Sequence, residues 1–379
     1  MRVLNVNHTL DSVHGGGTAE RTFQISRFLA RAGVDCTVLT TAAGMDPRRT
    51  AELAGVTVVA VPLLFRRFFV PRPALAEFHR LVSHADVVHL MGHWTLLNAV
   101  IYWFSRRLRK PYVVCPAGAL PIFGRSRLLK QLYNRVVGRS IVQNASACVA
   151  ITEDEIAHFA QYGVTADRIR VIPNGINAED FSKSDPEGFR ARFGLGSHPL
   201  VLFVGRLNPI KGPDLLLQAF LMVKNRFPDH HLVFAGPDGG MLGTLRQTTR
   251  AAGMDDRVHF IGYLGGMDKA SAYRAATLLA IPSRQEAMSI VALEAGINGV
   301  PVLLTDRCGF NAVEGRGGKV VGATAEDIAT GLGELLAAPA KLKEMGKSLN
   351  EFTRERHLWG TVVRGYITLY DQLTSRGSG

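Results

Sequence analysis

The apolar positions of this chain fall into short runs that are separated by longer amphipathic or irregular segments. Short runs rich in β-branched side chains predict strands, and the segments between them predict helices. Because strands that alternate with helices form parallel sheets covered on both faces, this pattern predicts an α/β fold. In the first half, the predicted strands are residues 3–7, 34–40, 56–61, 87–90, 112–115 and 147–151.

A glycine-rich loop follows the first predicted strand. Gly15, Gly16 and Gly17 precede a helical pattern that begins near Thr18, and Gly33 is typical of a helix C-cap. Such glycines let backbone N–H groups approach an anion at a helix N-terminus, and the same turn also serves tight packing. The dinucleotide fingerprint GxGxxG is not met, and no acidic residue follows the second strand at the ribose-binding spacing. The loop therefore disfavours a nicotinamide enzyme.

The same alternation restarts in the second half. A turn-rich stretch at 172–175 separates the two halves, and a chain of 379 residues has the length expected for two domains. We therefore divide the chain into a first domain, 1–175, and a second domain, 176–359, each Rossmann-like with its own parallel sheet. In the second half, the predicted strands are residues 200–205, 231–235, 258–261, 278–281 and 300–304, with a helix at 215–223.

The charge is concentrated in one stretch of the chain. The net charge is +12, and 47% of residues are hydrophobic, which excludes an intrinsically disordered chain. Residues 48–139 carry 15 Lys and Arg against 3 Asp and Glu. This excess predicts a localised anionic partner, which is nucleic acid, anionic lipid or a phosphorylated substrate. No RNA- or DNA-binding signature is present, so we expect no nucleic-acid partner.

The cysteines and the apolar runs indicate the compartment. The four cysteines lie far apart without a CxxC pair, which predicts neither a zinc site nor a disulfide framework and favours a reducing compartment. The first residues contain no apolar run of signal-peptide length, and no run of about 18 apolar residues occurs elsewhere. We expect a cytoplasmic protein, or one that touches a membrane from outside.

Three segments that supply the charge also contain aromatic or other apolar residues. Residues 65–70 interleave Phe and Arg, residues 101–110 end a helix in cations, and residues 126–139 form an amphipathic helix. Aromatic and basic side chains together suit an anionic lipid headgroup interface. The alternative is that the apolar faces pack on the sheet and the arginines are solvated. The third segment would place on one face Leu128, Leu129, Leu132, Tyr133, Val136 and Val137, and nearer the other Arg127, Lys130, Arg135 and Arg139.

Two cations follow the first strand of the second half. Arg206 and Lys211 lie five residues apart after the strand at 200–205. Open α/β sheets bind ligands outside the carboxyl ends of their strands, and a planar guanidinium with a mobile ammonium suits a pyrophosphate. The alternative is a pair of solvated loop charges.

Two carboxylates frame the start of a later helix. Glu286 follows the strand at 278–281, and Glu294 lies eight residues further along. No histidine pair accompanies them, so we expect no metal site. Two acceptors near a helix N-terminus suit a polyhydroxylated ligand. The alternative is an acid that complements the helix dipole, with an unrelated second glutamate.

Sequence landmarks follow one another in both halves: GRLNPIKG, LVFAGPDGG, VHFIGYLG, EAMSIVALE and GVPVLLTD in the second, and GGGTAE, DVVHLMGHW, PYVVCPAGAL and VIPNGIN in the first. In this order and spacing, the motifs resemble those of the retaining family-4 glycosyltransferases of the GT-B fold. The resemblance covers nearly the whole chain and is nearest to the branch that builds bacterial surface polysaccharide and lipopolysaccharide. It implies two Rossmann-like domains with parallel sheets facing an interdomain cleft. A C-terminal helix at about 360–379 is a candidate for packing back onto the first domain.

The resemblance implies a donor site for a UDP- or GDP-sugar. Arg206 and Lys211 would hold the diphosphate, Glu294 the ribose hydroxyls, and Glu286 the hydroxyls of the transferred sugar. Arg206, Lys211 and Glu286 are thereby the candidate catalytic residues. Backbone amides would meet the phosphate and the reaction centre at Gly16, Gly17, Met288, Ser289 and Ile290.

Two positions depart from the family pattern. Ser289 stands where Gly is usual, and Ala117 stands where many relatives have His. On the acceptor side, either His14 or His93 assists instead, or the enzyme needs no side-chain base.

The family's proposed reaction is front-face substitution with retention of configuration, without a metal or other cofactor. The acceptor would be a glycan or a lipid-linked sugar, presented to a peripheral enzyme on the cytosolic face of the inner membrane. Two alternatives stay open. One is a nucleotide-sugar epimerase or phosphorylase on the same fold. The other is a non-catalytic nucleotide-sugar-binding partner of a membrane assembly, which Ala117 motivates.

Overall fold

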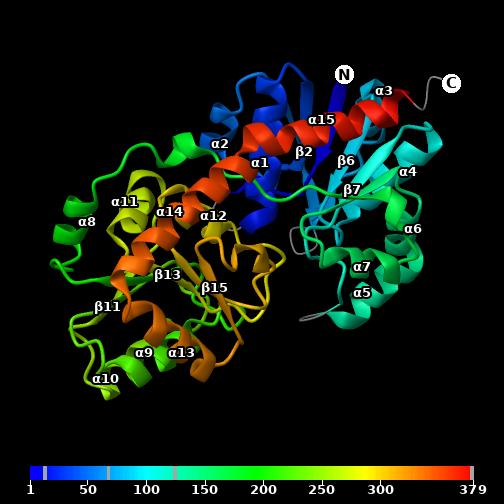
Figure 1. Cartoon of the computed structure of the whole chain (residues 1–379). Helices are drawn as coiled ribbons and strands as arrows, with labels where there is room; N and C mark the ends of the chain where they lie inside the picture. Colours follow the sequence, from blue (N-terminus) through cyan, green and yellow to red (C-terminus); the bar gives the residue numbers. More distant parts are fainter. Residues whose placement is uncertain (12–14, 66–68, 123–125, 376–379) are drawn as a thin grey trace. The chain divides into compact units, whose positions relative to one another are not determined.

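The computed structural model describes residues 1–11, 15–65, 69–122 and 126–375. The chain divides into two compact units (Figure 1). The first unit contains Met1–Asn174 and the residues from Trp359 onward, and the second contains Gly175–Leu358. The division predicted from the sequence lies within one residue of both crossing points.

A seven-stranded parallel sheet forms the centre of the first unit. Its order is β3-β2-β1-β6-β7-β8-β9, and parallel pairing is continuous across it. The strands are β1 (Arg2–Val6), β2 (Asp35–Thr41), β3 (Val56–Val61), β6 (Val87–Met91), β7 (Tyr112–Cys115), β8 (Ala147–Ala150) and β9 (Ile169–Val171). A separate antiparallel pair consists of β4 (Leu63–Phe65) and β5 (Val70–Pro71).

Helices connect these strands and pack on the sheet. The helices are α1 (Gly16–Arg31), α2 (Pro47–Glu52), α3 (Leu75–His84), α4 (Leu96–Arg107), α5 (Arg127–Tyr133), α6 (Arg139–Gln143), α7 (Glu155–Gln161) and α15 (Trp359–Ser375). A π-helical turn, Asn134–Gly138, joins α5 to α6. The C-terminal helix α15 packs on α1 and β6 of this unit.

A six-stranded parallel sheet forms the centre of the second unit, in the order β12-β11-β10-β13-β14-β15. Its strands are β10 (Leu200–Val204), β11 (His231–Ala235), β12 (Val258–Gly262), β13 (Leu278–Ile281), β14 (Val302–Thr305) and β15 (Gly318–Val321). Its helices are α8 (Pro186–Arg192), α9 (Pro213–Val223), α10 (Leu242–Ala251), α11 (Gly266–Ala275), α12 (Ile290–Ile297), α13 (Ala325–Leu336) and α14 (Pro339–Arg356).

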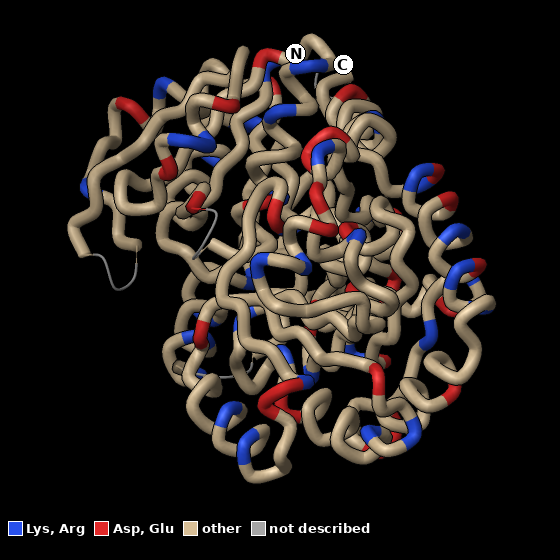
Figure 2. The backbone as a smooth tube through the Cα atoms, turned by 90° about the vertical axis from the view of Figure 1, so that its left-hand side faces the viewer, with Lys and Arg blue, Asp and Glu red and all other residues tan. Residues whose placement is uncertain are grey.

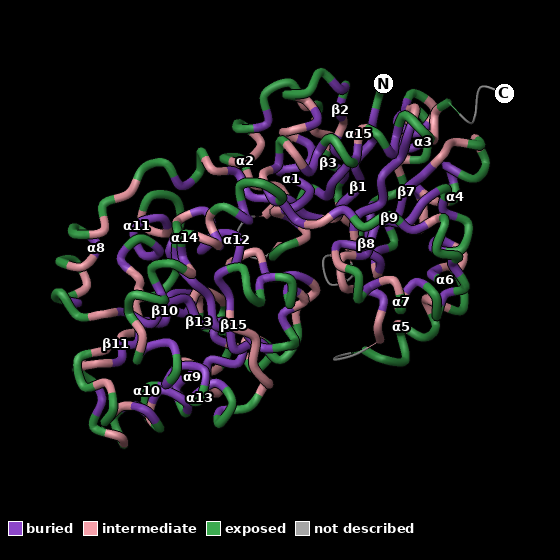
Figure 3. Tube along the Cα trace, in the orientation of Figure 1, coloured by how far each residue is buried: buried purple, intermediate pink, exposed green. Residues whose placement is uncertain are grey.

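The predicted fold class, an α/β chain with two Rossmann-like halves on parallel sheets, is confirmed. Helix α1 ends at Arg31, and Gly33 follows in the left-handed region with φ 80°, as a C-terminal cap requires. The sequence pattern missed β9 and β15, which are short edge strands that carry a charged residue, Arg170 and Lys319, in place of a continuous apolar run. The central strands are largely buried (Figure 3).

Both sheets reverse their strand order at one point. In the first unit the reversal lies between β1 and β6, and in the second it lies between β10 and β13. Loops that leave the carboxyl ends of such neighbouring strands diverge, so ligands of open α/β sheets bind there. In the second unit these two loops contain Arg206, Lys211 and Glu286. No helix within the described ranges is both long and apolar enough to cross a bilayer.

Candidate functional site

An ion pair spans the switch point of the second unit. Lys211, from the loop after β10, places Nζ 2.8 Å from Oε1 of Glu286, from the loop after β13. The Glu286 side chain is 8% exposed and the Lys211 side chain is 33% exposed. The structure therefore brings together two residues that lie 75 positions apart in the sequence, at the edge where the topology predicts a ligand.

The close approach of these two loops depends on Gly212. Its φ is 66°, and a Cβ atom at this position would lie 2.1 Å from the carbonyl oxygen of Pro282. Arg284, which the sequence analysis did not single out, joins the same loops. Its amide donates to the Ile210 carbonyl at 2.8 Å, and its guanidinium donates to both carboxylate oxygens of Asp214 at 2.9 and 2.6 Å. These contacts fix the Lys211 loop against the Glu286 loop.

The Glu286 loop is also held by the segment that follows β14. The Ser283 hydroxyl donates to Oε1 of Glu286, and the Glu286 amide donates to the Arg307 carbonyl at 2.8 Å. Gly309, at φ 60°, lies so close that a Cβ atom would be 1.9 Å from the Ala287 carbonyl oxygen. Glu286 is thus presented by a rigid loop, which suits a group that must accept hydrogen bonds from a ligand at fixed positions.

Arg206 lies in the same loop as Lys211 and is exposed. The next residue, Leu207, donates its amide to the Pro237 carbonyl at 3.0 Å, and Gly239 donates back to the Leu207 carbonyl at 3.0 Å. The loop after β11 therefore supports the Arg206 loop from the opposite side to Gly212. The predicted diphosphate pair, Arg206 and Lys211, lies on a loop fixed at both ends.

The N-terminus of α12 lies at the end of the Glu286 loop. Ser289 is its N-cap, and the Ser289 hydroxyl makes no capping hydrogen bond. This hydroxyl is buried and has no hydrogen-bond partner within the described part of the chain. Met288 is buried, and Ile290 begins the helix. With no acidic residue in the first turn, the helix N-terminus favours an anion at this position.

Glu294 lies further along α12, and its carboxylate is held by two side chains of α11. Nζ of Lys269 lies 2.6 Å from Oε1, and the Tyr273 hydroxyl donates to Oε2 at 2.6 Å. Burial and the neighbouring carboxylate raise the pKa of Tyr273 well above its ordinary value, so that its hydroxyl stays a donor. The sequence analysis missed both partners, although their i, i+4 spacing on one helix places them on one face.

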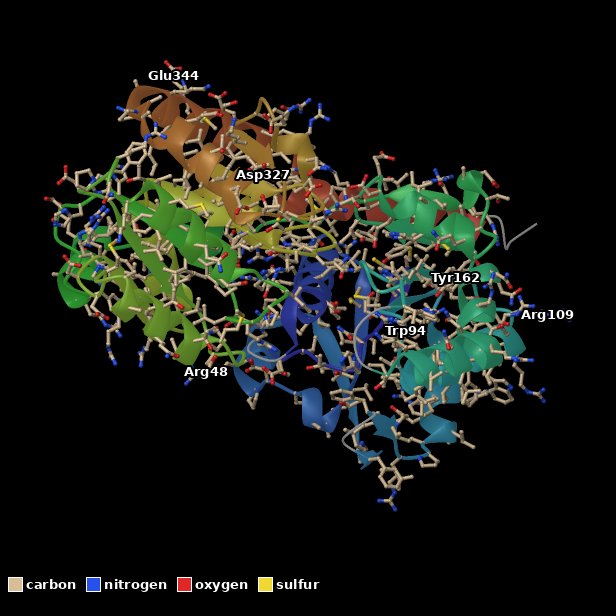
Figure 4. The ribbon with its side chains drawn as sticks, turned by 90° about the horizontal axis from the view of Figure 1, so that it is seen from below. Arg48, Trp94, Arg109, Tyr162, Asp327 and Glu344 are labelled. Atoms are coloured by element: carbon tan, nitrogen blue, oxygen red, sulfur yellow. The ribbon has the colours of Figure 1, made fainter. Side chains whose placement is uncertain are left out.

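The remaining site residues belong to the first unit. Gly16, at φ 61°, and Gly17 form the first turn of α1. His14 lies outside the described residues. His93 is 2% exposed; its Nε2 lies 3.0 Å from Oδ1 of Asn134, and its ring packs against Trp94 and Tyr162, which are labelled in Figure 4. Burial lowers the pKa of His93 to about 4, so that the imidazole is neutral at physiological pH. This environment favours a packing role for His93.

The turn that contains Ala117 is held by a hydrogen bond to a buried carboxylate. Ala117 adopts a left-handed conformation with φ 48°, which is uncommon for a residue with a Cβ atom. The amide of the next residue, Gly118, donates to the buried Glu155 carboxylate, which also accepts from the Ile151 amide at 2.6 Å. Burial raises the pKa of Glu155. Position 117 is therefore part of a hydrogen-bonded turn and carries no titratable side chain.

No group of three or more His, Cys, Asp and Glu side chains within the described ranges is placed to hold a metal ion.

Comparisons with known proteins show the family to which the chain belongs. Residues 16–175 match the family model of the glycosyl transferase 4-like domain, and residues 187–352 match that of the glycosyl transferases group 1. The chain is 30% identical over 391 residues to a D-inositol 3-phosphate glycosyltransferase of Gordonia bronchialis, covering 94% of this chain and 84% of that protein.

Two solved structures show the same fold. Anabaena Alr3699/HepE in complex with UDP has a TM-score of 0.79 at 20% identity and covers 98% of this chain and all of its own. WaaG, a glycosyltransferase involved in lipopolysaccharide biosynthesis, has a TM-score of 0.70 at 20% identity, with 98% of this chain and 99% of WaaG covered. Both units therefore have the architecture of GT-B glycosyltransferases, and the chain belongs to the group 1 glycosyltransferases with a 4-like N-terminal domain.

Proposed function

We propose that this protein transfers a sugar from a nucleotide diphosphate sugar to a hydroxyl group of an acceptor, with retention of configuration and without a metal. UDP is the proposed nucleotide, because a structural neighbour binds UDP and UDP-glucose. Arg206 and Lys211 bind the diphosphate, Glu286 accepts hydroxyls of the transferred sugar, and Glu294 accepts ribose hydroxyls. The amides of 288–290 add neutralisation at the phosphate.

The Lys211–Glu286 ion pair is the observation that carries this assignment. The donor carries an anionic diphosphate next to a polyhydroxylated sugar. This chemistry matches the pair, because Lys211 can bind the phosphate oxygens and Glu286 can accept hydrogen bonds from the sugar hydroxyls. Both are held at the switch point by Gly212 and Arg284. Fixed charges of this kind stabilise a leaving diphosphate without reorganising during the reaction.

The proposed chemical step is a front-face substitution. The bond between the anomeric carbon and the diphosphate oxygen breaks while the acceptor oxygen bonds to the same face of that carbon. The acceptor proton passes to the leaving phosphate oxygen, so that the step requires no side-chain base. The buried, neutral His93 and the non-titratable Ala117 are compatible with this route.

The stereochemistry and metal requirement are tested by following the reaction with NMR in the presence of a chelator. We expect the first-formed product to keep the anomeric configuration of the donor. The rate of transfer should be the same with and without the chelator. An inverted product would refute the retaining mechanism, and loss of activity that Mg²⁺ or Mn²⁺ restores would refute metal independence.

For the acceptor, we propose a lipid-linked sugar or lipopolysaccharide-type glycan presented at an anionic membrane, which places the protein on the cytosolic face of that membrane. The apolar stripe on α5 and the following π-helical turn supports this proposal. Leu128, Leu132 and Val136 are 82%, 57% and 72% exposed, and they repeat at intervals of four residues. The alternative that this face packs on the sheet is wrong for these three residues, because Tyr133 and Val137 make that contact instead.

Basic side chains border the stripe. Arg127, Arg135 and Arg139 are exposed on the same helical segment, and Figure 2 marks Lys and Arg positions in blue. Each cation near an anionic leaflet contributes about 1 kcal/mol. The two arginines of the segment 65–70, Arg66 and Arg67, lie outside the described residues, so that the α5 segment defines this surface.

A flotation assay with liposomes tests this surface. We expect the wild-type protein to float with anionic vesicles, and to be released by salt because exposed charges are screened over about 8 Å at physiological ionic strength. A triple variant, Leu128→Ser with Leu132→Ser and Val136→Ser, should stay unbound, whereas Met222→Ser, at an exposed apolar position of the second unit, should float like wild type. Equal recovery on neutral and anionic vesicles would contradict the role of the basic side chains, and recovery on neither would contradict membrane docking.

A soluble phosphorylated polyol is the second candidate acceptor, since the relatives at about 30% identity are D-inositol 3-phosphate glycosyltransferases. The basic excess of the first unit also suits a phosphate group. Transfer to D-inositol 3-phosphate without lipid, together with failure to float, would establish this candidate in place of the membrane acceptor.

A further inference from the structure

Two side chains of α11 engage both oxygens of the Glu294 carboxylate. Lys269 contacts Oε1 and Tyr273 contacts Oε2, each at 2.6 Å. The Glu294 side chain is only 9% exposed, and its helix neighbours Leu293 and Ala295 are fully buried. A carboxylate in such surroundings requires a compensating partner, because an unpaired buried charge is strongly destabilising.

The arrangement leaves acceptor capacity on both oxygens. An ionised carboxylate offers about four lone-pair positions, and Lys269 and Tyr273 use one on each oxygen. One or more positions per oxygen stay available, which matches a vicinal diol that donates two O–H groups. The Lys269 side chain is 25% exposed, whereas Tyr273 is fully buried, so that Lys269 is the partner of this carboxylate that solvent reaches.

We propose that Lys269 and Tyr273 are positioning residues that orient the Glu294 carboxylate toward the ribose 2′- and 3′-hydroxyls of the donor nucleotide. Lys269 thereby makes the second unit discriminate ribonucleotides from 2′-deoxyribonucleotides. The inference rests on the proposed nucleotide-sugar function and adds a specificity role for a pair of residues outside the two-glutamate motif.

The Lys269–Glu294 ion pair differs from an ion pair at the protein surface. Lys319 and Glu334 form an ion pair of the same length, 2.6 Å, in the same unit, but the Glu334 side chain is 58% exposed. Solvent satisfies an exposed carboxylate when its lysine is removed, whereas the buried Glu294 would have to turn toward another partner. Lys319→Met is therefore a control for the loss of one lysine charge from this unit.

The test is isothermal titration of UDP and of 2′-deoxy-UDP against the full chain. Wild type should bind UDP about 10-fold or more tightly than 2′-deoxy-UDP, as expected for a hydroxyl that donates to a carboxylate. In Lys269→Met, this ratio should fall toward one, because UDP loses two hydroxyl contacts to Glu294 whereas 2′-deoxy-UDP has only its 3′-hydroxyl contact to lose. Lys269→Arg should restore most of the ratio, and Lys319→Met should keep the wild-type value.

A second variant covers the case in which Lys269→Met does not fold. Tyr273→Phe keeps the buried ring and removes only the hydroxyl, and it should also lower the ratio. An unchanged ratio in Tyr273→Phe and in any folded Lys269→Met protein would overturn the inference, and so would a wild-type protein that binds both nucleotides equally. If wild type binds neither nucleotide, the proposed function itself fails.

Discussion

Tyr366→Phe should destabilise the first unit by removing one partner of a buried arginine. Arg21 on α1 is 1% exposed, and its guanidinium donates to the Tyr366 hydroxyl on α15, to Oδ1 of Asn174, and to the Ile172 carbonyl at 3.2 Å. The hydroxyl therefore joins the C-terminal helix to a residue 345 positions earlier in the chain.

The magnitude follows from the charge of the donor. Phe fills almost the same volume as Tyr, so that no cavity forms and the lost hydrogen bond dominates. A hydrogen bond from a charged donor contributes about 1.5–3 kcal/mol, against about 0.5–1.5 kcal/mol for a neutral one. Tyr112→Phe is the matched control, because the buried Tyr112 hydroxyl donates to the Ile141 carbonyl at 2.8 Å in the same unit.

Tryptophan fluorescence during urea unfolding reports the stability of the first unit. The three tryptophans, Trp94, Trp103 and Trp359, all belong to the first unit. We expect Tyr366→Phe to lower the free energy of unfolding by more than Tyr112→Phe does. Equal losses in the two variants, or no loss in Tyr366→Phe, would refute the argument that the buried guanidinium depends on this hydroxyl.

Three further predictions concern pH and the candidate site. Burial lowers the pKa of His89 to about 3 and that of His93 to about 4, whereas both histidines titrate near 6.5 when unfolded. The unfolded chain therefore binds more protons than the folded chain below pH 6.5, so that the free energy of unfolding of the first unit should fall on acidification from pH 6.5 to about 4. His93→Gln should reduce the slope of this free energy against pH by about 1.2 kcal/mol per pH unit near pH 5. An equal slope in both proteins would contradict this. Ser289→Ala removes a buried hydroxyl that has no hydrogen-bond partner among the described residues, so that the free energy of unfolding should stay equal or rise by up to about 1 kcal/mol. UDP affinity should be unchanged, and a tenfold loss would show that the hydroxyl contacts the ligand. Gly212→Ala places a methyl group against the Pro282 carbonyl and should abolish UDP binding by displacing the Lys211 loop, and wild-type affinity would contradict that account.

The positions of Lys211 and Glu286 could be predicted because each follows a buried strand, and topology brings the carboxyl ends of neighbouring strands to one edge. The Lys269–Glu294 pair could not, because nothing in the local spacing shows that α11 and α12 meet through these two side chains. The contact between Arg21 and Tyr366 could not be predicted from the sequence either, since it joins opposite ends of the chain.

The α5 segment shows a different limit of sequence reasoning. Its pattern indicated an apolar face but could not decide between packing and exposure, because the segment has two apolar faces. Tyr133 and Val137 pack on the core, whereas Leu128 and Val136 face solvent. For His93 the sequence showed a histidine after a strand, and only the structure shows the aromatic rings that bury it.

Calorimetric titration of UDP-glucose, with a chelator present, is the measurement that most directly tests the assignment of the donor site to the second unit. The account predicts that the wild-type protein binds, and that Lys211→Met loses at least about 10-fold in affinity through the lost contact to the diphosphate. Lys319→Met, which removes a lysine from a solvent-exposed ion pair of the same unit, should bind like wild type. Wild-type affinity in folded Lys211→Met would contradict the account.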